Sequence, residues 1–237
     1  MIEAANEAGV TLMVTENVWF DPTLQHVRDL LHAGVIGAPA LVRITREANL
    51  GEDFLANRQW SLDREQAAGG IMMSGGIHDV EKCRMLLDAQ PISVYAAQAR
   101  QRIPAMEGDD TSTAIIRFDD GSVVVLVESF NAMKLETAHS EHHTLEIDGE
   151  AGSIEIDGDG RITVFTPDQV TPWTDHPTDH RTDDESTNTF EQVVEHFLDC
   201  IDTNAEPITS GRTQRLSLKV ISAAYESMAS NQVVSIE

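Results

Sequence analysis

The residue whose type is best suited to catalysis is His78, which lies in a glycine-rich segment from Gly69 to Glu81. A histidine can give or take a proton near neutral pH, so it can serve as a general acid or base. On one continuous helix, Ser74, His78 and Lys82 would lie one above another. The alternative is a helix packed against a sheet, in which His78 makes only a structural hydrogen bond. His78 is therefore a candidate catalytic residue, and Ser74 a candidate partner for its ring.

A second group of histidines comprises His139, His142 and His143. In an extended chain His139 and His143 would point to one side and His142 to the other. Nothing in this spacing fixes the converging geometry that a metal ion needs, so we predict no metal site. Two Thr-Asp-His triplets, at 174–176 and 178–180, are more typical of a solvated loop than of a site.

Familiar nucleotide and nucleophile motifs are absent from the sequence. The nearest approach to G-x-G-x-x-G is the segment 158–160, which lacks the third glycine and falls in a predicted hairpin. No Walker A loop, C-x-x-C pair or G-x-S-x-G elbow occurs. The sequence therefore shows no turn that would cradle the phosphates of a dinucleotide.

The first residues predict a fragment of an α/β unit. Residues 1–9 are typical of a helix that stops at Gly9. Residues 10–14 form a short apolar run, typical of a strand buried in a parallel sheet. Because one parallel strand cannot make a sheet, we expect either that the chain starts late in a larger design or that this strand joins the edge of a later sheet.

The remaining chain alternates between helical and strand periodicity. A helix begins at Asp21-Pro22 and ends at Gly34, and residues 49–68 are irregular. Further helices are predicted over 70–87, from 190 to about 201, and over 212–229, with a polar loop at 167–186. Strands are predicted over 39–45, 92–99, 111–118, 122–130, 143–147, 153–156, 162–165 and 233–236.

These elements predict an α+β fold: a large, mainly antiparallel sheet with helices on one face, preceded by a stub of an α/β domain. Such a sheet often leaves one face uncovered. Val123, Val125 and Val127 alternate with Val124 and Leu126, so both faces of that strand are apolar. We therefore expect a homo-oligomer that forms through the open face.

The charge balance excludes several partners. The 237 residues carry 40 acidic and 16 basic side chains, a net charge of −24. Nucleic acids and anionic membranes both need basic surfaces, so neither is an expected partner. No apolar run approaches the roughly 20 residues of a membrane span, and no basic leader precedes one. Two cysteines suit a reducing cytoplasm, and the diffuse acidity suits a surface adapted to high salt, although an ordinary acidic protein is the alternative.

The order of these pieces resembles the Gfo/Idh/MocA family of NAD(P)-dependent oxidoreductases over essentially the whole chain. The resemblance is to the last helix and strand of the Rossmann domain, in residues 1–17, and to the C-terminal substrate and oligomerisation domain, in residues 18–237. The resemblance rests on the following segments: residues 1–14, Glu16-Asn17 followed by Phe20-Asp21-Pro22, the turn Gly34–Gly37, Trp60 and Asp63 before Gly69-Gly70, the G-x-H-x-x-D-like segment Gly75–Glu81, and Gly121-Ser122, Gly149–Ser153, Pro207 and Gly211.

The resemblance implies hydride transfer between NAD or NADP and a hydroxyl carbon of a sugar, polyol or related molecule. It places His78 in the substrate pocket as a proton relay or hydroxyl binder. It places Asn17 near both nicotinamide and substrate, and Trp60 beside the cofactor. We add His139 as a substrate-binding candidate.

The sequence departs from the family pattern in its cofactor site. The glycine-rich phosphate loop and the catalytic lysine of the E-K-P motif are missing, so we expect weak or no NAD(P) binding by this chain alone. Many members carry Asp four residues before the histidine, where this chain has Ser74, which can orient an imidazole but carries no charge. Whether the chain is an enzyme by itself stays open: the alternatives are a non-enzymatic oligomerisation or sugar-binding module, and one half of a split dehydrogenase.

Overall fold

The computed structural model describes residues 1–50, 56–99, 101–132, 141–173 and 189–236. Its centre is a sheet of nine strands in the order β8-β7-β6-β5-β1-β4-β3-β2-β9. The strands are β1 (Pro39–Ala48), β2 (Pro91–Gln98), β3 (Thr111–Phe118), β4 (Val123–Ser129), β5 (Glu141–Gly149), β6 (Ser153–Ile156), β7 (Ile162–Thr166), β8 (Gln169–Trp173) and β9 (Val234–Ser235). Within this sheet only β1 and β4 run parallel, so the predicted fold class is confirmed.

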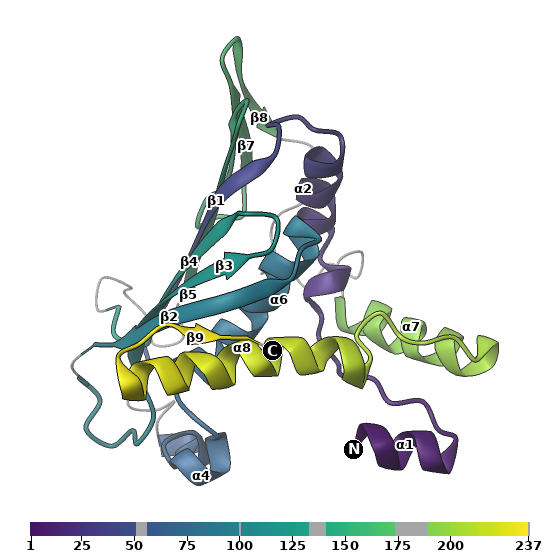
Figure 1. Cartoon of the computed structure of the whole chain (residues 1–237), viewed down its shortest axis with the longest axis vertical. Coiled ribbons are helices and arrows are strands. Elements are labelled where there is room, and N and C mark those ends of the chain that lie inside the picture. The colour runs from purple at the N-terminus through teal and green to yellow at the C-terminus, as the bar shows by residue number, and fades with distance from the viewer. Residues whose placement is uncertain (51–55, 100, 133–140, 174–188, 237) are drawn as a thin grey trace.

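Helices cover one face of the sheet. Figure 1 shows α2 (Pro22–His32), α6 (Gly76–Leu87) and α8 (Gly211–Ser230) on the same side of it. The sequence starts α2 as predicted, because the Asp21 carboxylate accepts hydrogen bonds from the backbone of Thr23 and Leu24. One apolar core joins these helices to the sheet, and it includes Val27, Ile44, Val80, Leu126 and Ile221.

The other face of the sheet is partly apolar and partly charged. Ile92, Ile115 and Val127 are 39–45% exposed there. Arg43 of β1 lies among them and pairs with Glu146 and Asp148 of β5. Within the described residues, no helix is long and apolar enough to cross a membrane.

The amino-terminal segment differs from the prediction. Helix α1 (Ile2–Ala8) ends at Gly9 in the left-handed conformation, as expected, but none of its residues is buried. The predicted strand over 10–14 makes a single bridge, from Met13 to Ser210, and joins no sheet in the described part of the chain. Val10 is 61% exposed, so an apolar run alone did not predict its surroundings correctly.

Two further elements depart from the prediction. Residues 169–173 form the edge strand β8, where a polar loop was expected, because an exposed edge strand carries little alternating apolar signal. The predicted helix over 70–87 is broken at Gly75 into α5 (Ile71–Ser74) and α6. The shorter elements include the 3-10 turns η1 (Val18–Phe20) and η2 (Gln59–Ser61) and helix α4 (Arg64–Ala67). Helix α7 (Thr189–Thr203) is present as predicted.

A buried carboxylate, Asp109, fixes the start of α5. It accepts hydrogen bonds from the backbone N–H groups of Gly70 and Met72 and from the hydroxyls of Ser112 and Tyr225. Burial and the Asp109 charge raise the pKa of Tyr225, which keeps that hydroxyl protonated as a donor. Asp109 therefore ties α5, β3 and α8 together just ahead of the segment that carries His78.

We predict that Asp109→Asn lowers the free energy of unfolding by about 2–3 kcal/mol, because the amide NH2 would face donors that now meet a carboxylate oxygen. Urea unfolding followed by circular dichroism measures this. The matched control is Asp63→Asn, since Asp63 caps α4 at an exposed site. Equal losses in the two variants would contradict the prediction.

Candidate functional site

The break at Gly75 lets the first turn of α6 lie against the sheet. A Cβ atom on Gly75 would come within 2.6 Å of Cδ of Arg46, so only glycine permits this approach. A Cβ on Gly70 would lie 1.9 Å from the Asp109 carbonyl oxygen. These two glycines therefore serve close packing of the backbone, and they place His78 in the first turn of α6.

His78 is held by a carboxylate from a distant part of the chain. Its Nδ1 lies 2.7 Å from Oε2 of Glu16. The Glu16 side chain is 5% exposed, whereas the His78 side chain is 42% exposed. The other carboxylate oxygen of Glu16 accepts the backbone N–H of Val18 at 3.1 Å. Glu16 belongs to the Glu16-Asn17 pair on which the family resemblance partly rests, but that resemblance predicted a role only for Asn17.

Ser74 does not supply this contact. Its hydroxyl donates to the Gly70 carbonyl oxygen at 3.1 Å, within its own short helix. The helix break after Ser74 also removes the regular spacing that would stack Ser74 on His78. The structure therefore brings Glu16, and not Ser74, to the ring.

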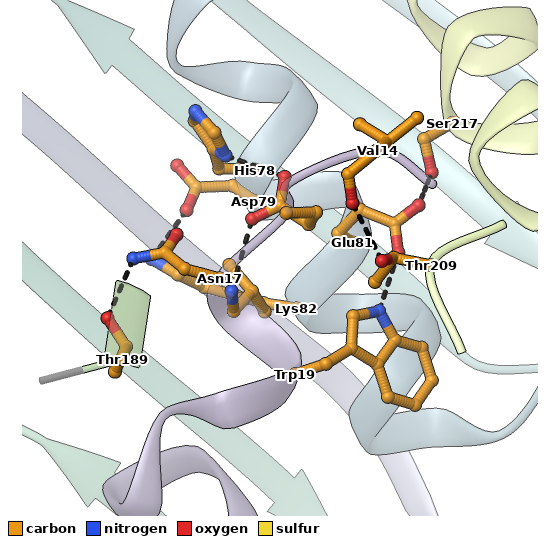
Figure 2. Close-up of polar contacts among 12 residues, drawn as sticks. Val14, Asn17, Trp19, His78, Asp79, Glu81, Lys82, Thr189, Thr209 and Ser217 are labelled. Carbon is orange, nitrogen blue, oxygen red and sulfur yellow. Dashed lines mark hydrogen bonds and ion pairs between the residues drawn. The ribbon is translucent and has the colours of Figure 1, made fainter. Parts of the chain in front are cut away.

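Asn17 lies next to this pair in the chain. Its Nδ2 donates to Oγ1 of Thr189, the first residue of α7, at 3.2 Å (Figure 2). The site is thus assembled from the segment that precedes η1, from α6 and from the start of α7. Trp60 lies on η2 and is 54% exposed. His139 lies outside the described residues.

Beneath His78 lies a buried cluster of charges. Arg46 donates two hydrogen bonds to Asp79, at 2.8 and 2.9 Å, and Lys82 Nζ lies 2.7 Å from the same carboxylate. Glu128 lies 3.6 Å from Arg46 Nε, and the side chains of Asp79 and Glu128 are both fully buried. His143 Nε2 lies 3.2 Å from Arg46 Nη1.

The pKa values of the two buried carboxyl groups of this cluster are shifted in opposite directions. Burial alone would raise the pKa of Asp79, but the adjacent Lys82 and Arg46 charges hold it well below its usual range. Burial and the neighbouring Asp79 charge raise the pKa of Glu128 well above its usual value. The cluster therefore holds an ionised Asp79 beside a Glu128 that keeps its proton.

Glu81, the last residue of the histidine motif, contacts side chains of three elements of the fold. It accepts the Trp19 indole N–H at 3.0 Å and is hydrogen-bonded to Ser217 (Figure 2). It also lies 2.5 Å from Arg84 Nη1. These contacts join α6 to η1 and α8. Within the described residues, no group of three or more His, Cys, Asp or Glu side chains could hold a metal ion.

Comparison with known proteins gives one family and many relatives. The GFO/IDH/MocA C-terminal domain matches residues 24–155. D-apiose dehydrogenase of Rhizobium rhizogenes is 26% identical over 248 residues, which cover 100% of this chain and 67% of that protein. D-xylose 1-dehydrogenase [NADP(+)] of Haloarcula marismortui is 25% identical over 239 residues, with 100% and 63% covered. Myo-inositol 2-dehydrogenase of Thermotoga maritima is 23% identical over 246 residues, with 100% and 68% covered.

Solved structures show the same fold. An oxidoreductase from Agrobacterium radiobacter in complex with NAD+, L-tartaric acid and magnesium matches with a TM-score of 0.83 and 26% identity, over 99% of this chain and 68% of that one. Aldose-aldose oxidoreductase from Caulobacter crescentus, complexed with glycerol, matches with a TM-score of 0.83 and 23% identity, over 99% and 66%. The chain thus spans about two thirds of the length of the relatives that it matches.

We predict that the proton on Glu128 makes folding stability depend on pH. The unfolded chain releases this proton above the ordinary value of 4.5, whereas the folded chain keeps it to a higher pH. The free energy of unfolding should therefore fall as pH rises above about 4.5, by up to about 1.4 kcal/mol per pH unit for one proton. Urea unfolding at several pH values between about 5 and 8 measures the slope.

The variant Glu128→Gln keeps the size of the side chain and cannot titrate, so its slope should be flatter than that of the wild type. Glu65→Gln, a change at an exposed site, is the control for the lost carboxyl group. A slope in Glu128→Gln equal to that of the wild type would contradict the assignment of the proton to Glu128.

Proposed function

Because the chain belongs to the Gfo/Idh/MocA family, we propose that it forms the substrate-binding part of an NAD(P)-dependent dehydrogenase. The proposed reaction is hydride transfer at a hydroxyl carbon of a sugar or polyol. The observation that carries this proposal is the half-exposed His78 imidazole held at Nδ1 by the buried carboxylate of Glu16. Relatives named for D-apiose, D-xylose and myo-inositol support the substrate class.

In this proposal His78 handles the proton of the reaction. During oxidation the substrate O–H bond breaks, and its proton passes to Nε2 of the ring; during reduction Nε2 returns it. A positioned general base or acid accelerates such a step by roughly 10²–10⁴-fold. Asn17, which follows Glu16 in the chain, is proposed to bind a substrate hydroxyl or the amide of the cofactor.

The described residues do not fit the pyrophosphate of a dinucleotide. No glycine-rich turn joins a strand to a helix in the described part of the chain, and residues 10–14 make one bridge in place of a parallel ladder. We therefore derive no step through the cofactor, which supplies the hydride acceptor or donor when it is bound elsewhere in the enzyme.

We propose that residues 1–17 belong to a dinucleotide-binding unit and residues 18–237 to the substrate and oligomerisation domain. Two exposed surfaces support this division. Helix α1 has no buried residue. On α7, Val194, Leu198 and Ile201 form an apolar stripe that is 49–55% exposed. Trp60, which is 54% exposed, is proposed as a cofactor-side residue.

We also propose a homo-oligomer that forms through the uncovered sheet face, in a cytoplasm of high salt. Ile92, Ile115 and Val127 supply apolar area on that face. The net charge of −24 with 16 basic residues supports the salt adaptation, because screening by salt removes the self-repulsion of so acidic a surface.

We predict that the 237-residue chain alone does not bind NADH or NADPH with micromolar affinity, because its sequence contains no glycine-rich phosphate-binding motif. Titration in molar KCl, followed by nicotinamide fluorescence, tests this. A matched titration with xylose or myo-inositol tests the alternative of a sugar-binding module, which would bind the polyol without cofactor. Saturable micromolar binding of NAD(P)H would overturn the proposal that the dinucleotide is bound outside this chain.

We predict that His78→Asn lowers kcat by roughly 10²–10⁴-fold in the dehydrogenase that contains both this chain and a dinucleotide-binding domain, with a smaller change in KM. The matched control is His32→Asn, which changes an exposed histidine in the last turn of α2. A kcat within twofold of the wild type would exclude His78 as the proton carrier.

A further inference from the structure

We infer that Glu16 is the positioning residue for His78: its buried carboxylate takes the Nδ1–H of the ring and leaves Nε2 as the atom that faces substrate. The inference rests on the proposed function of His78. Ser74, four residues before the histidine, does not fill this place, because its hydroxyl donates to the Gly70 carbonyl oxygen.

The contacts of Glu16 fix the direction of the hydrogen bond to the ring. Oε1 already accepts the N–H of Val18, and Oε2 lies 2.7 Å from Nδ1. An ionised carboxylate can only accept, so Nδ1 must carry the hydrogen. In the neutral ring Nε2 is then unprotonated, which is the state that accepts a proton from a hydroxyl.

The backbone around Glu16 holds this carboxylate in place. The Glu16 N–H donates to the Val14 carbonyl oxygen at 2.8 Å, and the Val14 N–H donates to the Thr209 carbonyl at 2.9 Å. The Thr209 hydroxyl donates back to the Val14 carbonyl at 2.7 Å (Figure 2). The segment that carries Glu16 is thereby pinned to the chain just ahead of α8.

The other charged groups near the ring are engaged elsewhere. Asp79 and Glu81 on α6 are paired with cations, as described above. Ser74 is bonded to Gly70. The surrounding elements contribute Arg46 from β1, Glu128 from β4, His143 from β5 and Lys82 from α6. Among the contacts of the described residues, Glu16 is thus the carboxylate that meets His78.

In the proposed oxidation, the substrate O–H bond breaks and its proton forms the second N–H of His78. The C–H bond of the same carbon also breaks, and its hydride would be accepted by an oxidised nicotinamide cofactor. The ring becomes an imidazolium between the product oxygen and the Glu16 carboxylate. The negative charge of Glu16 stabilises that cation without moving, because the carboxylate is already in place.

The test is the tautomer of His78, measured by two-dimensional 15N–1H spectra of the imidazole nitrogens in the 237-residue chain at alkaline pH. His78→Asn identifies the resonances. We expect the Nδ1–H tautomer to dominate in the wild type and in Glu7→Gln, an exposed control. In Glu16→Gln we expect the population of that tautomer to fall. A wild-type ring that carries its hydrogen on Nε2, or a tautomer unchanged in Glu16→Gln, would overturn the inference.

A second variant covers the case in which Glu16→Gln does not fold. Glu16→Asp retains the charge on a shorter side chain, and we expect partial retention of the Nδ1–H tautomer. Loss of that tautomer to the level of free histidine in Glu16→Asp supports a strict distance requirement. A tautomer that is equally mixed in the wild type and in Glu16→Asp contradicts the positioning role.

Kinetics separate this inference from the proposed function. In the dehydrogenase assay we expect Glu16→Gln to lower kcat by about 10-fold or more with a smaller change in KM, and Glu16→Asp to restore part of it. If the tautomer behaves as expected but neither Glu16→Gln nor His78→Asn changes kcat, the proposed function fails and the positioning contact stands. If His78→Asn abolishes activity but Glu16→Gln has no effect, the positioning role is wrong.

Discussion

The ion pair between Arg46 of β1 and Asp79 of α6 is the interaction on which the site depends. Asp79 is fully buried, and a buried carboxylate is costly unless cations and hydrogen bonds satisfy it. Arg46 meets it with two hydrogen bonds, and Lys82 meets it with a third contact. A shift of helix α6 along the sheet would therefore leave the buried Asp79 carboxylate without its cationic partner. Because His78 is the neighbour of Asp79 in α6, this ion pair also fixes the position of His78. Gly75 makes the approach possible, since any side chain there would collide with Arg46.

Three carboxylates near the histidine have three different uses, which their burial alone does not distinguish. Asp79 anchors α6 to the sheet, and Glu81 anchors it to η1 and α8 through Trp19 and Ser217. Glu16 is also buried, yet its partner is the imidazole of His78, whose side chain is 42% exposed. The exposure of the partner separates the proposed catalytic contact from the structural ones.

Comparison of the chain with its relatives supports the proposal that substrate and cofactor bind to different parts of the enzyme. The described residues include the histidine that we propose as the proton carrier and a sheet with one uncovered face, whereas the phosphate-binding turn of a dinucleotide site is not among them. The chain spans about two thirds of the length of its relatives. We propose that the active site lies where the segment before η1, the first turn of α6 and the start of α7 meet.

Local patterns in the sequence determined much of the fold. The alternation in Thr111–Phe118 and Val123–Ser129 predicted the hairpin, Asp21-Pro22 predicted the start of α2, and the order of motifs predicted the family. These features depend on neighbours in the chain, so a single sequence records them. The resemblance to the family also predicted a place for His78 in the substrate pocket.

The tertiary structure alone decided which group touches that histidine. Glu16 lies 62 residues before His78, and a contact over that separation leaves no periodicity to read. The helix break at Gly75, the single bridge of residues 10–14 and the edge strand β8 have the same origin, since each depends on what packs against the segment. The sequence by itself determined the elements and the candidate histidine; the packing of α6 on β1 decided that Glu16, rather than Ser74, stands beside the ring.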